Sequence, residues 1–123
     1  MPRFVIQEHR KQDEPTHWDL MLEQGEALKT YRLDLPPGEV VHQPATATPI
    51  ADHNKRFLTY EGPVQQGAGQ VRIVDRGTYR SAERREDRWE LALSGGILKG
   101  NFTLTRTEGD AWLFALEESE ERR

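Results

Sequence analysis

Runs in which apolar and polar residues alternate recur along almost the whole chain of 123 residues. Successive side chains of a β-strand point to opposite faces, so a period of two predicts strands with one buried face. Turn-forming residues separate these runs at 23–26, 36–38, 94–96 and 108–110. Short strands at this spacing predict an all-β fold, a compact single-domain β-barrel, with a β-sandwich as the alternative. The clearest runs are Phe4–Gln7, His17–Leu22, Gly69–Val74, Trp89–Leu93, Asn101–Arg106 and Ala111–Leu116.

Two stretches depart from this pattern. Residues 38–54 contain Pro44 and Pro49, and we expect them to form a long irregular loop. Residues 80–87 have a composition that suits a helix. The chain length predicts one domain, which we place at residues 1–117, followed by a charged C-terminal tail at 118–123.

The composition excludes several classes of protein. The chain has no cysteine, so it has neither disulfides nor thiolate metal sites. No apolar run approaches the roughly twenty residues of a membrane span, and the N-terminus lacks a signal-peptide core. We therefore expect a cytoplasmic protein without membrane contact, and a monomer.

The formal net charge of −4 is unevenly distributed. Residues 117–123 contribute four glutamates, whereas Arg72, Arg76 and Arg80 follow one another at intervals of four. On a regular strand that spacing places the three arginines on one face. Such a stripe either meets the phosphates of a nucleic acid or forms a solvated exterior paired with glutamates. The charge therefore permits a nucleic-acid partner.

The segment from His9 to Glu23 carries the main candidate site. His17 and Asp19 are two residues apart, so on a strand their side chains lie on the same face. Imidazole and carboxylate together suit a divalent transition metal, and His9 would complete a facial set of three ligands. Ligand histidines must be neutral, so metal binding should weaken on acidification. A non-haem iron site, with His53 in place of His9, is the alternative reading of the same ligand types.

His53 follows the expected loop and precedes two cations, Lys55 and Arg56. A side chain that titrates near neutrality suits proton transfer, and basic neighbours suit phosphate. His53 is therefore a candidate catalytic residue.

Several short motifs occur along the chain in a characteristic order. Together they resemble the 3′-phosphoesterase domain of bacterial DNA ligase D, including its small stand-alone relatives, and the likeness covers nearly the whole chain. The motifs are Phe4–His9, His17–Glu23, Leu28–Lys29, Asp52–His53, Tyr60–Gly62, Gly67–Gly69, Asp75–Tyr79 and Leu98–Arg106.

The resemblance implies a β-barrel with a manganese-dependent site that removes ribonucleotides and phosphates from DNA 3′ ends. It implies that His9, His17 and Asp19 bind Mn²⁺, or another divalent ion such as Zn²⁺ or Co²⁺, and that His53 lies near the bound phosphate. A DNA ligase or polymerase is an expected partner. The segments Asp75–Thr78 and Leu98–Gly100 are expected to serve the fold rather than the chemistry.

Two positions depart from the family pattern. The family has an arginine where this chain has Met21, and a tyrosine where it has Phe57. A thioether cannot make the two parallel hydrogen bonds by which a guanidinium grips a phosphate. Lys55 or Arg56, and less directly Arg76, are candidates to supply that charge. The leading hypothesis is a metal-dependent 3′-phosphoesterase, and the alternative is a catalytically silent relative that binds metal and nucleic-acid ends.

Overall fold

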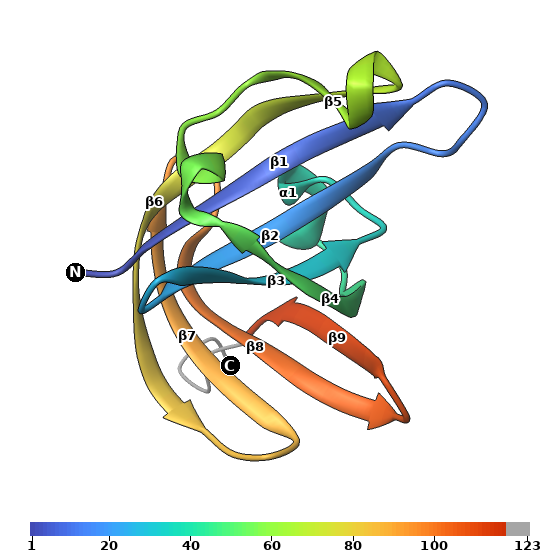
Figure 1. Cartoon of the computed structure of the whole chain (residues 1–123). Coiled ribbons are helices and arrows are strands. Elements are labelled where there is room, and N and C mark those ends of the chain that lie inside the picture. The colour runs from blue at the N-terminus through green and yellow to red at the C-terminus, as the bar shows by residue number, and fades with distance from the viewer. Residues whose placement is uncertain (118–123) are drawn as a thin grey trace.

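The computed structural model describes residues 1–117 and shows one antiparallel sheet that closes on itself (Figure 1). Eight strands follow one another around a ring in the order β1-β2-β3-β4-β9-β8-β7-β6, and β6 pairs with β1 to complete it. This barrel-like architecture confirms the predicted all-β fold. The strands are β1 (Arg3–Lys11), β2 (His17–Gln24), β3 (Ala27–Leu33), β4 (Ala45–Asn54), β5 (Gly62–Val64), β6 (Gly69–Arg84), β7 (Arg88–Gly95), β8 (Lys99–Glu108) and β9 (Ala111–Leu116).

Three short helical segments complete the described chain: α1 (Pro37–Val40), η1 (Lys55–Leu58) and η2 (Gln65–Gly67). None of the helices within residues 1–117 has the length and apolar character needed to cross a membrane. The proposed tail at 118–123 lies outside the described residues.

The main core lies inside the ring. On β1 and β2 the even-numbered residues Phe4, Ile6, Leu20 and Leu22 point inward, and all four are buried. Other strands add large side chains to the same cluster, among them Tyr31, Tyr79, Trp89, Leu91, Phe102, Leu104 and Phe114. Burial of this apolar surface is the main favourable contribution to folding.

A second, smaller apolar cluster lies on the outer face of the ring. Val5 and Met21 face each other across β1 and β2, and together with Leu28 they pack against Leu58 of η1. The Gln7 side chain donates hydrogen bonds to the Phe57 and Tyr60 carbonyls, at 3.1 and 2.8 Å. The segment η1 therefore lies across the outside of the β1–β2 pair and is fastened to it.

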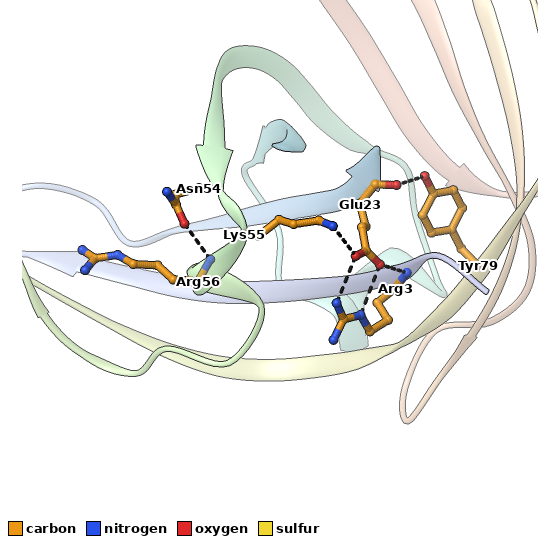
Figure 2. Close-up of polar contacts among 6 residues, drawn as sticks. All are labelled: Arg3, Glu23, Asn54, Lys55, Arg56 and Tyr79. Atoms are coloured by element: carbon orange, nitrogen blue, oxygen red, sulfur yellow. Dashed lines mark hydrogen bonds and ion pairs between the residues drawn. The ribbon is translucent and has the colours of Figure 1, made fainter. Parts of the chain in front are cut away.

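Glu23, near the end of β2, binds the first residue of η1, Lys55, and so anchors the N-terminal end of this segment (Figure 2). Its carboxylate accepts hydrogen bonds from the Arg3 backbone and guanidinium, at 2.8 to 3.1 Å, and pairs with Lys55 at 3.1 Å. Its backbone carbonyl accepts a hydrogen bond from the Tyr79 hydroxyl. The hydrogen bond from Arg3 is the main reason that the pKa of Glu23 falls from 4.5 to about 2.

Asp75 joins the two segments expected to serve the fold. Its buried carboxylate accepts backbone N–H hydrogen bonds from Gly96, Ile97 and Leu98, all at 2.8 to 2.9 Å. These bonds satisfy three donors in the turn between β7 and β8. The Asp75 carboxylate thus connects the two segments structurally.

Two local expectations were wrong. Residues 38–54 form α1 and β4 rather than an irregular loop, because Ala45 and Ala47 pack into the core while Thr46 and Thr48 point outward. Residues 80–84 continue β6 instead of forming a helix. They pair with β7, and the Arg84 guanidinium lies 3.9 Å from the centre of the Trp89 ring. Tertiary pairing thus overrides local helical composition.

The expected stripe of three arginines is also broken. The pairing of β1 with β6 shifts register between Ile6 and Gln7, so Ile6 faces Asp75 while Gln7 faces Ile73. The extra residue reverses the inside–outside alternation along β6. As a result Arg72 pairs with Glu8, whereas Arg76 lies beside Ile73 on another face.

The hydrogen bonds of Asp75 predict that a nearly isosteric substitution at this residue lowers the stability of the fold. Asp75→Asn replaces one acceptor oxygen by a donor NH₂ group among three N–H donors, which should lower the free energy of unfolding by about 1.5–3 kcal/mol. Urea denaturation measures this change. Asp110→Asn, at an exposed turn residue, is the matched control, and equal stabilities of the two variants would contradict the assigned role.

The low pKa of Glu23 predicts a pH dependence of stability. Since its folded pKa is depressed, its contribution is present above its ordinary pKa of 4.5 and is lost as the pH falls toward about 2. Glu23→Gln should therefore be less stable than the wild type at about pH 6, and the gap should narrow toward about pH 3. Thermal unfolding at both pH values tests this, and a gap that stays constant would refute it.

Candidate metal centre

The pairing of β1 with β2 brings the predicted ligands together. His9 faces His17, and Gln7 faces Asp19, on the outer face of the ring. Met21 follows on the same face, as the spacing predicted, and is buried in the outer cluster. The three ligand-type residues come from two adjacent strands, so their backbone positions are fixed by the sheet.

The distances between the ligand atoms suit a single ion. His9 Nδ1 lies 2.9 Å from His17 Nε2, and His17 Nε2 lies 3.7 Å from Asp19 Oδ1. One ligand atom from each of the three residues falls within 4.8 Å of the others. Ligands bonded to one metal at about 2.1 Å are roughly 3–3.5 Å apart, so only small adjustments are needed.

The protonation state and hydrogen bonding of the group also fit a metal. Asp19 is nearly fully buried, and its Oδ1 atom has no hydrogen-bond donor among the described residues. Burial lowers the pKa of His9 and of His17, which favours the neutral imidazoles that coordination requires. His53 does not belong to this group, so the arrangement favours the set with His9 over the alternative iron set.

Gly69 of β6 provides the space for the His9 ring. A Cβ atom at residue 69 would lie 2.8 Å from His9 Nε2 and 3.2 Å from Val64 Cγ2. Any larger residue would therefore push the imidazole away from His17. The sequence alone does not predict this contact, because Gly69 is far from His9 along the chain.

A pocket of about 460 Å³ opens beside the metal ligands. His9 and Asp19 form part of its wall, and His53, Arg56 and Phe57 form another part. The His53 Nδ1 atom lies 3.0 Å from the Ala51 carbonyl, so Nδ1 carries a proton and Nε2 remains available. The structure thus places His53 and Arg56 in the same pocket as the ligands.

The other two predicted phosphate-binding residues lie elsewhere. Lys55 pairs with Glu23 and does not line this pocket (Figure 2). Arg76 lines a separate hollow with Glu61 and Asp75. Arg56 differs from both, since it lines the same pocket as His9 and Asp19, and its guanidinium lies 5.0 Å from the centre of the Phe57 ring.

Sequence reasoning missed Arg32 of β3. It faces Asp19 directly across the β2–β3 hairpin, and its Nε atom lies 3.6 Å from Asp19 Oδ1. The position of the turn at Gly25 is enough to predict that Arg32 lies opposite Asp19. Asp19 is five residues before Gln24, and Arg32 is five residues after Ala27, which pairs with Gln24.

Comparison with known proteins identifies the family of the chain. The family model described as the DNA Ligase D 3′-phosphoesterase domain matches residues 7–106. The multifunctional non-homologous end joining protein LigD of Mycobacterium bovis is 35% identical over 119 residues, 89% of this chain and 15% of the relative. A LigD protein of Mycobacterium tuberculosis, described as a multifunctional non-homologous end joining DNA repair protein, matches with the same identity and coverage.

The chain thus spans only 15% of the length of these relatives. The family match covers most of the chain and includes His9, His17 and Asp19, the three residues that converge in space. The chain belongs to the DNA ligase D 3′-phosphoesterase domain family.

Proposed function

We propose that this chain is a divalent-metal-dependent phosphoesterase, using Mn²⁺, that removes a 3′ ribonucleotide or a 3′ phosphate from DNA ends during repair. The observation that carries the proposal is the convergence of His9, His17 and Asp19 beside a pocket that also holds a histidine and an arginine. Family membership supports a role at DNA ends, and the names of the relatives support a role in non-homologous end joining alongside a DNA ligase.

Each residue has a distinct role in this proposal. His9, His17 and Asp19 hold the ion, which activates water and polarises a phosphoryl oxygen when bound. His53 transfers a proton through Nε2 to the oxygen of the leaving group, since its Nδ1 is committed to the Ala51 carbonyl. Arg56 attracts the phosphate from η1, where the Phe57 and Tyr60 rings hold its guanidinium.

The second candidate is a silent relative that binds metal and DNA ends without turnover. Met21 favours it, because this residue lies on the ligand face and offers no charge. Its side chain is buried beneath η1, so this position is closed to substrate. Arg56 favours catalysis, since it places a cation in the pocket.

The central prediction concerns a DNA primer that ends in one ribonucleotide. With Mn²⁺ the protein should shorten this primer or release phosphate, a chelator should stop the reaction, and added Mn²⁺ should restore it. Asp19→Asn should reduce the rate by about a thousandfold or more, because the ion loses its carboxylate ligand. Gel analysis of labelled primer measures the rate.

Circular dichroism of the variant establishes that the fold persists. Metal and end binding with no turnover by the wild type would identify the silent relative instead. Turnover that persists in Asp19→Asn and in the presence of chelator would sink the metal-dependent mechanism.

The packing of Gly69 predicts a second effect on metal binding. Gly69→Ala should weaken Mn²⁺ binding by about 10- to 100-fold, since the added methyl group displaces the His9 ring. Gly38→Ala is the matched control, because a Cβ at residue 38 meets no atom within 4 Å. Calorimetric titration with Mn²⁺ compares the two variants, and equal affinities would rule out the positioning role of Gly69.

A further inference from the structure

A second hollow, of about 440 Å³, lies on the other side of the metal ligands. His17 and Arg32 line it together with Thr46 and Thr48 of β4. The first pocket contains His9 and Asp19, so the three ligands separate the two spaces. A substrate bound at the ion therefore has room on the β3 side as well as on the η1 side.

Arg32 provides the positive charge of this second hollow. Its Nε lies 3.6 Å from Asp19 Oδ1, too far for a hydrogen bond, and its side chain is 44% exposed. Within residues 1–117 the Arg32 guanidinium makes no hydrogen bond to another side chain. By contrast, Arg3 and Arg72 each donate to a glutamate at 3.0 to 3.2 Å. Arg32 is thus a cation whose donors are available.

The acidic residues of the hollow have other partners. Glu14 pairs with Lys11 at 3.3 Å, and Asp34 Oδ1 accepts the Thr46 backbone N–H at 2.9 Å. Asp19 would be engaged by the ion in the proposed function. Arg32 would then lose its only carboxylate neighbour among the described residues, beside a position where an anion binds.

We infer that Arg32 binds a non-bridging oxygen of the substrate phosphate from the β3 side, which makes it a substrate-binding residue of the active site. This inference rests on the proposed function. A planar guanidinium with several donors suits a phosphate, and Arg32 reaches the ligand group from the strand next to β2. The phosphate is thereby approached by Arg32 on one side and Arg56 on the other.

The test compares Arg32→Gln, Arg32→Lys and Arg80→Gln. The last variant removes the same charge from an exposed residue of β6, away from both hollows. Each purified protein is titrated with Mn²⁺ alone, and the Mn²⁺-loaded protein is then titrated with inorganic phosphate. Turnover of the ribonucleotide-ended primer gives kcat and KM.

Arg32→Gln should bind inorganic phosphate at least about tenfold more weakly and lose turnover, because a charge-assisted hydrogen bond is missing. It should bind Mn²⁺ as tightly as the wild type or more tightly, since a positive charge beside Asp19 is gone. Arg32→Lys should recover part of the phosphate affinity. Weaker phosphate binding with undiminished Mn²⁺ affinity separates substrate binding from a structural role, because a structural role would weaken both.

Phosphate affinity and turnover equal to those of Arg80→Gln would overturn the inference alone and leave the proposed function intact. A wild type that binds Mn²⁺ and phosphate without turnover would defeat the proposed catalysis, while the phosphate titrations would still decide the role of Arg32. Failure of the wild type to bind Mn²⁺ would overturn both.

Discussion

The register of the β1–β2 pair is the constraint on which the site depends. Side chains alternate strictly along a strand, so a slip of one residue in this pair would turn one of the two strands over. His9 would then lie on the opposite face from His17 and Asp19, and either Phe4 and Ile6 or Leu20 and Leu22 would leave the core. The large cost of exposing that core holds the register. The positions of the predicted ligands are therefore fixed by apolar residues on the opposite face of the same strands. The candidate metal centre is as stable as the ring that carries it.

The sequence predicted those parts of the molecule that depend on alternation within one strand. β1 and β2 have long, clear alternation, so spacing alone predicted that His17 and Asp19 share a face, while it left His9 and His53 as alternative third ligands. β4 was missed because alanine and threonine alternate with little contrast in hydrophobicity, and β3 because no clear alternation marked it. The helix expected over 80–87 failed because pairing with β7 outweighed local composition. Arg32 and Gly69 act through neighbours on other strands, which spacing along one segment does not reveal.

The structure shows what Met21 and Phe57, the two departures from the family pattern, contact. Met21 is part of an apolar cluster that η1 covers, so it contributes packing rather than charge. Phe57 lies in the same segment, where its ring contacts His53 and its carbonyl accepts a hydrogen bond from Gln7. The cations near the ligands come instead from η1 and β3, at Arg56 and Arg32. The chain thus has the three predicted ligands, while the cations near them lie on other elements of the fold.

The attachment of η1 to the outside of the ring separates two properties of the protein. The predicted metal ligands lie on strands whose backbone hydrogen bonds close the ring, whereas one wall of the pocket belongs to η1, which Gln7, Glu23 and Leu58 attach to the ring. Residues of η1 can change without breaking a strand pairing. In the proposed function, substitutions in η1 would therefore change which nucleic-acid end the pocket accepts without changing the affinity for the ion.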